Sequence, residues 1–329
     1  MAADVVGREQ ELGALHAFLE RPREGPAAFV LEGEAGIGKS TLWLAGVAAA
    51  RDRGFLVLLS RPAEAERGLA HVVLGDVFEP VLDDVLPVLT APRRRALEAA
   101  LLVDHVPDAP VDPRALGVAI RSSLEALAGH GPLVVAVDDD QWLDASSANA
   151  LQFALRRLRG EHIRLFLARR LDDRPPARGL EQAIDADAVE RLRVGPLSVG
   201  ALQLLLKRRL GRTFPRGVML RLIETSGGNP FYALELARGL AAEGAIDPTE
   251  PFPVPESLDR LVTGHVEQLD CRTREALLMV AAHGRPTTAL LRASGIAPDL
   301  LDAAVATGAV EISKDVARFS HPLLASALY

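Results

Sequence analysis

The chain has very little cysteine and very little lysine. Cys271 is the single cysteine in 329 residues, which excludes an intramolecular disulfide and any cysteine-based metal site. Only Lys39, Lys207 and Lys314 are lysines, although lysine and arginine together number 37. A lysine found where a motif requires one is therefore a strong signal in this sequence.

Targeting and membrane signals are also missing. The sequence has no charged-then-apolar leader and no uninterrupted apolar stretch of membrane-spanning length, so we expect a cytoplasmic protein without a membrane partner. The formal net charge is −7, and the arginine clusters 93–95, 156–157 and 208–209 lie in helical patterns beside acidic residues. Nothing in this balance indicates a nucleic-acid-binding surface. A hydrophobic content of 49% and this length predict two or three domains.

The most informative segment is 33–40, Gly-Glu-Ala-Gly-Ile-Gly-Lys-Ser, which fits the phosphate-binding pattern G-x-x-x-x-G-K-[ST]. The glycines let backbone N–H groups converge on phosphate oxygens, Lys39 adds a mobile positive charge, and Ser40 offers a hydroxyl to Mg²⁺. The apolar run 27–32 and the helical pattern 41–51 supply the strand and helix that the motif needs. We therefore predict a nucleoside triphosphate site. Its residues are Gly33, Glu34, Ala35, Gly36, Ile37, Gly38, Lys39, Ser40 and Thr41.

Short apolar runs alternate with helical patterns through the first part of the chain. Besides 27–32, the predicted strands are 55–60, 133–137, 163–168 and 189–194. Such alternation predicts an α/β fold, here the three-layer parallel sheet of a P-loop NTPase with helices on both faces. We expect the segment 61–131 to form helices with irregular joins. We expect a helix over 146–159 capped by Ser146, with Asp144 as a second candidate cap.

The pattern changes after Pro196. Helices are expected at 199–210, 218–225 and 230–243, which together form a helical lid. The segment 247–255 holds four prolines and reads as a linker. Further helices and a hairpin near 309–313 and 317–320 then predict a winged-helix-like domain. The predicted domains are 1–196 for the P-loop NTPase, 197–246 for the lid and 247–329 for the winged-helix-like part.

An apolar helical stripe, Leu323, Leu324, Ala327 and Leu328, stops at Tyr329 without a cap or a polar tail. We therefore expect the chain to be the front part of a longer protein.

Three aspartates follow the strand 133–137. Metal-dependent phosphoryl chemistry needs a carboxylate at the end of a strand adjacent to the loop strand, so we expect these two strands to be neighbours. We assign Asp138, with Ser40, to Mg²⁺ and Asp139 to activation of the attacking water. The alternative is that the acidic run only caps the strand and solvates a turn, which is all that we expect of Asp140.

Two arginines, Arg169 and Arg170, follow the fourth predicted strand, where an arginine can reach the γ-phosphate. Arg170 is our choice for this catalytic sensor role. A surface ion pair is the alternative. Trp142 is expected to be a packing anchor rather than a residue that stacks on the base.

These motifs together resemble the ATPase part of the LuxR-type large ATP-binding transcriptional regulators, members of the STAND branch of AAA-like NTPases. The similarity spans essentially the whole chain. It is carried, besides the phosphate loop, by the segments 5–9, 137–144, 195–198, 225–238 and 318–324. The Asp-Asp-x-Gln-Trp-x-Asp and Gly-Gly-Asn-Pro-Phe elements are the more specific ones.

The resemblance implies further binding residues. It places the segment of Val6, Gly7 and Arg8 near the adenine of ATP or ADP. It places Asn229 and Pro230 in the helical lid over the base. It also makes His321 a candidate contact of the phosphates in a closed state, although a histidine here is also compatible with a purely structural role.

The function that the resemblance implies is an ATP-binding regulatory switch with slow hydrolysis and nucleotide-dependent self-association. In such regulators DNA is bound by a C-terminal domain that this chain lacks. One alternative is an initiator or loader AAA ATPase whose winged helix binds DNA directly. Another is an adaptor that binds nucleotide without hydrolysis, against which the intact pair Asp138 and Asp139 argues. A small-molecule kinase is disfavoured because nothing beyond the sheet resembles an acceptor pocket.

Overall fold

The structure is a computed structural model. It describes residues 5–102, 111–171, 179–242, 271–283, 286–306, 309–313 and 315–319. Contacts divide the chain into two compact units, Met1–Gly195 and Pro196–Tyr329, which are described separately.

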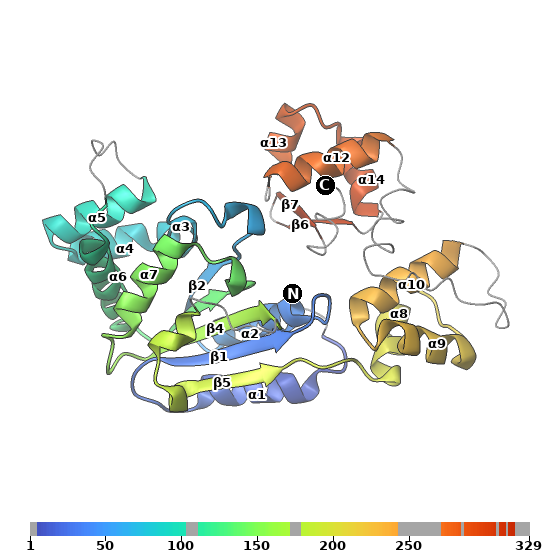
Figure 1. The fold of residues 1–329 in the computed structure, drawn as a ribbon, viewed down its shortest axis with the longest axis horizontal. Helices are drawn as coiled ribbons and strands as arrows, with labels where there is room; N and C mark the ends of the chain where they lie inside the picture. Colours follow the sequence, from blue (N-terminus) through green and yellow to red (C-terminus); the bar gives the residue numbers. More distant parts are fainter. Residues whose placement is uncertain are drawn as a thin grey trace. The chain divides into compact units, whose positions relative to one another are not determined.

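The first unit is built on a five-stranded parallel sheet (Figure 1). Its strands are β1 (Ala27–Gly33), β2 (Leu56–Ser60), β3 (Leu133–Val137), β4 (Ile163–Arg170) and β5 (Val189–Arg193). Their order across the sheet is β2-β3-β4-β1-β5, and every neighbouring pair is parallel. The predicted α/β fold class is confirmed. The expectation that the acidic strand adjoins the loop strand is wrong, because β4 lies between β1 and β3.

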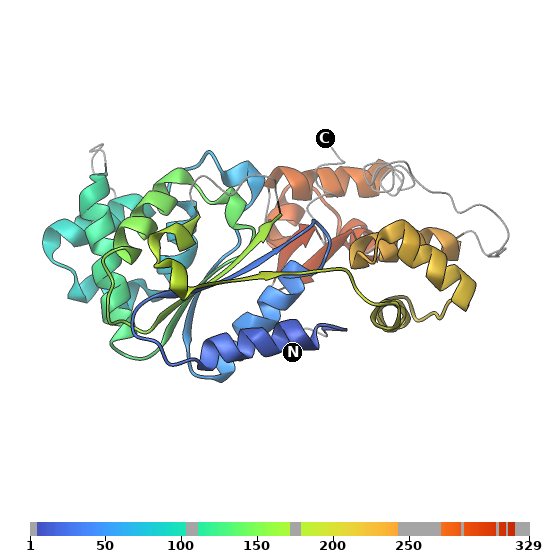
Figure 2. The same ribbon diagram turned by 60° about the horizontal axis from the view of Figure 1, so that its bottom comes forward.

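Two hydrophobic cores cover the two faces of the sheet, and alternation along β1 assigns each residue to one of them. Ala28 and Val30 join the core of one face, whereas Phe29 and Leu31 join the core of the other. The first core is completed by α3 (Val72–Phe78), α5 (Ala91–Leu101), α6 (Pro113–Ala128) and α7 (Ala145–Leu155). The second is completed by α1 (Glu9–Glu20) and α2 (Lys39–Asp52), which Figure 2 shows in blue on one side of the strands.

Short elements fill the joins. The segment after β2, expected to be helical with irregular joins, contains η1 (Glu64–Glu66), η2 (Glu79–Val81), α4 (Leu82–Val85) and η3 (Leu86–Val88) in addition to α3, α5 and α6. Three further 3-10 turns are η4 (Asp140–Trp142), η5 (Leu180–Ala183) and η6 (Ala186–Ala188).

The helix after β3 begins one residue earlier and ends four residues sooner than expected, since α7 spans Ala145–Leu155. Its cap is Asp144, whose Oδ1 accepts a hydrogen bond of 2.8 Å from the N–H of Ser147. The prediction of a Ser146 cap is therefore wrong, and the second candidate is the one observed. The same carboxylate accepts from the N–H groups of His71 and Val73, so it also fixes the start of α3.

The described residues of the second unit form helices and a small hairpin. Its first part holds α8 (Val199–Leu210), α9 (Arg216–Ser226) and α10 (Pro230–Ala242), whose apolar faces form one core. Its second part holds α12 (Cys271–His283), α13 (Thr288–Ala293), α14 (Pro298–Ala306) and the antiparallel strands β6 (Val310–Ser313) and β7 (Val316–Phe319) around another core.

This C-terminal region agrees with the fold class expected from the sequence. The division of the chain into three domains stays a prediction. The proline-rich segment 247–255 and the apolar stripe near the last residue lie outside the described residues. Among the helices that the structure describes, none is long and apolar enough to span a membrane.

Candidate nucleotide site

The phosphate loop joins the end of β1 to the start of α2. Gly38 is the N-cap of α2 and has a φ of 99°, in the left-handed region that side-chain-bearing residues avoid. A Cβ on Gly33 would lie 2.9 Å from Cγ2 of Ile37 and 3.0 Å from the carbonyl oxygen of Val194. Glycine is thus required by geometry at both ends of the loop. The first N–H groups of α2 have no partner within the helix and, with the helix dipole, favour an anion here.

Lys39 lies in the curve of this loop with only 7% of its surface exposed. Its Nζ donates hydrogen bonds of 3.0 Å to the carbonyl oxygen of Gly33 and 2.8 Å to that of Glu34. A buried ammonium group needs such partners, because burial without them is costly. The loop therefore holds the one lysine of the described P-loop unit next to the backbone that would receive phosphates.

Ser40 and Asp138 meet across the carboxyl edge of the sheet. The Ser40 hydroxyl donates a 3.2 Å hydrogen bond to Oδ1 of Asp138, which is 2% exposed. Burial raises the pKa of Asp138, and the charge of Asp139 raises it further. The nearby Arg61 charge and the hydrogen bonds from Ser40 and Arg61 act in the opposite direction. These two predicted metal ligands are thus adjacent in the fold.

Arg61 is a site residue that the sequence reasoning missed. It directly follows β2, and its Nη2 lies 3.0 Å from Oδ2 of Asp138. Its guanidinium carbon also lies 5.9 Å from the centre of the Trp43 ring. Its position directly after a predicted strand is its sole signal in the sequence, and the sequence does not reveal that β2 pairs with the acidic strand β3.

Asp139 and Arg170, the two predicted catalytic residues, are connected through Gln141. Asp139 has a φ of 55°, an uncommon backbone conformation for a residue with a side chain. Gln141 Nε2 donates a 2.8 Å hydrogen bond to Oδ1 of Asp139, and Gln141 Oε1 accepts a 3.2 Å hydrogen bond from the backbone N–H of Arg170. The structure thus brings the turn after β3 and the end of β4 together, while the roles of both residues stay predictions.

Trp142 is half-buried and has an arginine partner on each of two segments. The guanidinium carbons of Arg67 and Arg170 lie 6.0 Å and 5.8 Å from the centre of its ring. Such distances permit cation–π attraction. The ring is therefore placed to restrict where the Arg170 side chain points.

The N-terminal segment lies against the phosphate loop. Arg8 is 5% exposed, and its Nη2 donates a 2.9 Å hydrogen bond to the carbonyl oxygen of Ile37. Its Nη1 pairs with Glu11 at 2.9 Å. Val6 is buried and Gly7 has a φ of 65°. The segment is thus beside the loop, and its contact with adenine stays a prediction.

The predicted lid residues belong to the second unit. Asn229 is buried, and its Oδ1 accepts a 3.1 Å hydrogen bond from the N–H of Phe231, so it caps α10. Pro230 is the first residue of that helix. Contact of these residues with the base stays a prediction. His321 lies outside the described residues.

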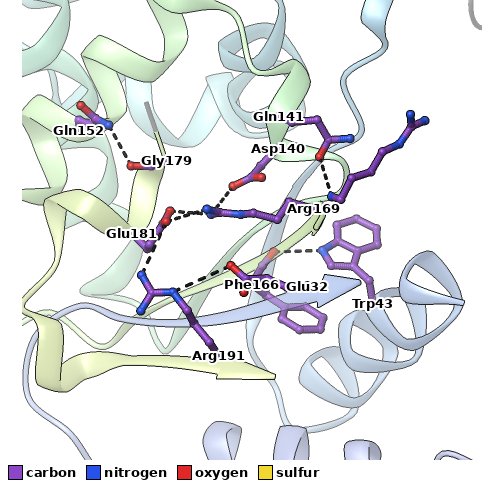
Figure 3. A network of polar contacts seen from close by, with 11 residues as sticks. Glu32, Trp43, Asp140, Gln141, Gln152, Phe166, Arg169, Gly179, Glu181 and Arg191 are labelled. Atoms are coloured by element: carbon purple, nitrogen blue, oxygen red, sulfur yellow. Dashed lines mark hydrogen bonds and ion pairs between the residues drawn. The ribbon is translucent and has the colours of Figure 1, made fainter. Parts of the chain in front are cut away.

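The prediction that Asp140 only caps the strand and solvates the turn is wrong. Asp140 is 4% exposed, and its Oδ2 accepts a 2.7 Å ion-pair hydrogen bond from Nη2 of Arg169 (Figure 3). Arg169 also binds both carboxylate oxygens of Glu181, at 2.7 and 2.6 Å. Burial raises the pKa of Asp140 to about 7, against the opposing charge of Arg169. Burial acts in the same direction on Glu181, but the hydrogen bond and charge of Arg169 hold its pKa below the usual value.

The residues at this edge fit a nucleoside triphosphate with Mg²⁺. A glycine-dependent loop, a lysine and helix N–H groups suit the phosphates, whereas the buried Asp138 carboxylate beside a hydroxyl suits a hard cation. Within the described ranges, no cluster of three or more His, Cys, Asp or Glu side chains could bind a metal by itself. Ser40 and Asp138 would therefore hold Mg²⁺ together with phosphate oxygens and water, as is usual for this ion.

The sheet order, the phosphate loop and the acidic residue opposite it define a P-loop nucleotide-binding protein. Residues 4–168 match the AAA ATPase domain family. The chain belongs to this family, which implies ATP binding. A search of curated proteins gave no match.

Several solved structures are similar to this chain at low sequence identity. A Signal Transduction ATPase with Numerous Domains (STAND) protein with a tetratricopeptide repeat sensor, from Pyrococcus horikoshii, has a TM-score of 0.58 at 15% identity. The match covers 98% of this chain and 42% of that one, so this chain spans less than half of that protein. The Walker-type ATPase of Pyrococcus abyssi matches with a TM-score of 0.48 at 18% identity, covering 99% and 96% of the two chains. The Orc1 protein of Aeropyrum pernix, solved with DNA, has a TM-score of 0.44 at 15% identity, covering 98% and 92%.

Proposed function

We propose that the chain is the ATP-binding switch module of a LuxR-family transcriptional regulator of the STAND type, with slow ATP hydrolysis. The observation that carries the proposal is the contact between Ser40 and Asp138 at 3.2 Å, with Asp139 as the next residue. This contact joins a phosphate-binding loop to an acidic turn. Such a pair serves both nucleotide binding and hydrolysis.

Each residue of the site has a role in this proposal. Lys39 and the N–H groups of the loop bind the phosphates, and Ser40 and Asp138 hold Mg²⁺. When bound, Mg²⁺ supplies positive charge that balances the phosphates. Asp139 orients the attacking water and accepts its proton, while Arg170 binds the γ-phosphate oxygens.

Signalling would depend on affinity differences more than on turnover. We propose that ATP favours an open, self-associating form and that ADP favours a closed form, since a ligand shifts an equilibrium only through its differential affinity. The likeness to the STAND protein of Pyrococcus horikoshii, described as a signal transduction ATPase, supports this choice at the level of the fold. The helical second unit supplies a body that can change its position with the nucleotide. In this proposal DNA is bound by a further C-terminal domain, and His321 contacts phosphate in the closed form.

The first experiment identifies the nucleotide that the purified chain carries and measures phosphate release with Mg²⁺ and ATP. Tightly held ADP with slow or absent turnover supports the switch. Protein that is empty and hydrolyses ATP briskly, and faster still with DNA, would instead indicate an initiator or loader ATPase whose winged helix binds DNA.

A matched pair of lysine variants tests the site itself. Lys39→Ala removes the buried ammonium group, and we expect ATP affinity to fall by about 10- to 100-fold. Lys207→Ala, on the exposed face of α8, is the control and should bind ATP like the wild type. Equal ATP affinity in the two variants would show that Lys39 does not bind the phosphates, and would contradict the assignment of the loop as the ATP site.

A further inference from the structure

Arg169 joins three segments at the carboxyl edge of the sheet. It is the seventh residue of β4 and is 3% exposed. One guanidinium binds Asp140 in η4 and both carboxylate oxygens of Glu181 in η5, with distances of 2.6 to 2.7 Å (Figure 3). A planar guanidinium presents its donors in a rigid fork, so this double pairing fixes direction as well as distance.

The pairing continues from Glu181 towards the phosphate loop. Arg191 of β5 lies 3.9 Å from Oε1 of Glu181 and 4.0 Å from Oε1 of Glu32. Glu32 immediately precedes Gly33, the first residue of the loop. Arg191 is half exposed, so these outer links are weak, whereas those of Arg169 are buried.

The two predicted catalytic residues directly adjoin, in the sequence, two members of the buried ion-pair group Arg169, Asp140 and Glu181. Asp139 precedes Asp140, and Arg170 follows Arg169. Gln141 forms a second link between the same two segments, through Asp139 Oδ1 and the N–H of Arg170. The turn after β3 and the end of β4 are thus held at two points, one ionic and one by an amide.

Asp139 needs this support because its backbone has a positive φ of 55°. A non-glycine residue in that conformation persists only when the surrounding structure enforces it. The ion pair of the next residue, Asp140, supplies such enforcement from a buried position. If this pair were lost, the turn would relax and the Asp139 carboxylate would shift relative to the phosphate loop.

We propose that Arg169, through Asp140 and Glu181, is a positioning residue that holds Asp139 and Arg170 in place for ATP hydrolysis. The inference rests on the proposed function for its kinetic consequence, since it concerns the same site. It predicts an asymmetry between binding and hydrolysis. The phosphates are bound by the loop, whereas the Arg169 guanidinium forms its hydrogen bonds with Asp140 and Glu181. Water activation depends on the turn that Arg169 fixes.

Arg164 offers a matched control on the same strand. It is 1% exposed at the opposite end of β4, and its guanidinium donates to backbone carbonyl oxygens, including those of Gly25 and Arg21. Replacing either arginine by methionine removes a buried guanidinium from β4. Only Arg169→Met removes the ion pair with Asp140, in the turn after β3.

The test measures hydrogen exchange, ATP affinity and phosphate release in the wild type, Arg169→Met, Arg169→Lys and Arg164→Met. Two amides report on the turn, because the N–H of Trp142 donates to the backbone carbonyl oxygen of Asp139 at 2.9 Å and that of Leu143 donates to the backbone carbonyl oxygen of Asp140 at 3.2 Å. In Arg169→Met we expect both to exchange about tenfold faster. ATP affinity should stay within about threefold of the wild type, since the loop is untouched, while phosphate release falls roughly 10- to 100-fold.

Arg169→Lys should recover part of both losses, because an ammonium group keeps the charge but not the forked geometry. Arg164→Met should leave exchange at Trp142 and Leu143 and the rate of phosphate release unchanged. If Arg169→Met does not fold, Asp140→Asn replaces it, since that change removes the carboxylate charge that Arg169 binds in the turn and preserves the side-chain shape. It should show the same changes at reduced size.

The outcomes separate this inference from the proposed function. If the wild type fails to bind ATP, the proposed function is wrong whatever the variants show. If the wild type binds ATP but exchange at Trp142 and Leu143 is equal in Arg169→Met and Arg164→Met, the positioning role is overturned while the switch proposal stands. Faster exchange with unchanged phosphate release would also overturn it.

Discussion

The guanidinium of Arg61 lies 3.0 Å from Oδ2 of Asp138, the carboxylate oxygen that Ser40 does not bind. Ser40 donates to the other oxygen, Oδ1, so the buried carboxylate has the Ser40 hydroxyl at one oxygen and the Arg61 guanidinium at the other. Arg61 opposes the effects of burial and of Asp139, which raise the pKa of Asp138. Because a cation binds the ionised carboxylate, Arg61 is placed to keep Asp138 in the form that Mg²⁺ requires.

Arg61→Met should therefore weaken the Mg²⁺ dependence of ATP binding. Without its arginine, Asp138 becomes harder to ionise, so the variant should need a higher pH to show the same Mg²⁺ effect. Titrations of ATP affinity against Mg²⁺ over a series of pH values measure this. The midpoint for the variant should lie at higher pH than for the wild type.

Arg67→Met is the control for Arg61→Met, because Arg67 lies over the Trp142 ring and belongs to the same region of the chain. It should leave the Mg²⁺ dependence unchanged. Tighter Mg²⁺ binding in Arg61→Met would mean that Arg61 competes with the metal for Asp138 instead of supporting it.

Asp139→Asn should trap ATP. The amide keeps the size of the side chain and can still pair with Gln141, so binding should persist, but it cannot accept a proton from water. Phosphate release should fall by about 100- to 10,000-fold, the usual range for loss of a general base. Single-turnover release with ATP and Mg²⁺ measures the change. Asp187→Asn, which removes an exposed pairing with Arg23, is the control.

Wild-type phosphate release in the Asp139→Asn protein would show that another group orients the water. Gln141 would then be the first residue to examine, because it contacts both Asp139 and the backbone of Arg170.

Local patterns were enough to predict the strands and the phosphate loop. The five strands appear within two residues of their predicted ends, since short apolar runs are buried on both faces in a parallel sheet. The loop could be predicted because its requirements are local, such as a glycine at position 38 with a φ of 99°. The coarse family assignment rests on these same residues.

Pairings between distant segments could not be predicted. Arg61 and Asp138 are 77 residues apart, and the pairing of β2 with β3 brings them together without leaving a local trace in the sequence. The same limit explains the error at Asp140. Three consecutive aspartates look like a solvated turn, but Asp140 is buried and pairs with Arg169 of β4, whose guanidinium also binds Glu181.

Gly46 is required by packing between α2 and the sheet. A Cβ there would lie 2.4 Å from Cε1 of Phe166 and 2.5 Å from Cδ1 of Leu15. Gly46→Ala should therefore lower the free energy of unfolding by about 1 to 3 kcal/mol, as overpacking of a core usually does. Gly13→Ala, with open space around the same atom in α1, should raise it by about 0.5 to 1 kcal/mol.

Urea unfolding followed by tryptophan fluorescence compares these two variants. Trp43 and Trp142 are the only tryptophans, so the signal reports on the unit Met1–Gly195 alone. A gain in stability for Gly46→Ala would show that α2 can shift away from β4 at little cost.

The buried ion-pair group of Arg169, Asp140 and Glu181 predicts how the free energy of unfolding changes with pH. The pKa of Asp140 is about 7 in the folded protein, above its usual value of 3.8. The folded state therefore holds this proton more tightly than the unfolded state. Its contribution to stability is complete below about 3.8 and is lost as the pH rises through about 7. Glu181 has the opposite sign, because its pKa is lowered and its contribution is lost only as the pH falls below its usual value of 4.5.

Asp140→Asn and Glu181→Gln separate these two effects, because each replaces a titrating group by a neutral one of the same shape. Between pH 5.5 and 8.5 the stability advantage of the wild type over Asp140→Asn should shrink by about 2 kcal/mol, since ionisation of Asp140 falls within this window. Its advantage over Glu181→Gln should shrink by less, since Glu181 is ionised in both states throughout and its charge is only one of the causes that raise the pKa of Asp140. Urea unfolding of the three proteins at both pH values measures the two differences. A constant difference for Asp140→Asn would mean that Arg169 keeps Asp140 ionised at all these pH values, and that the buried group carries one net negative charge.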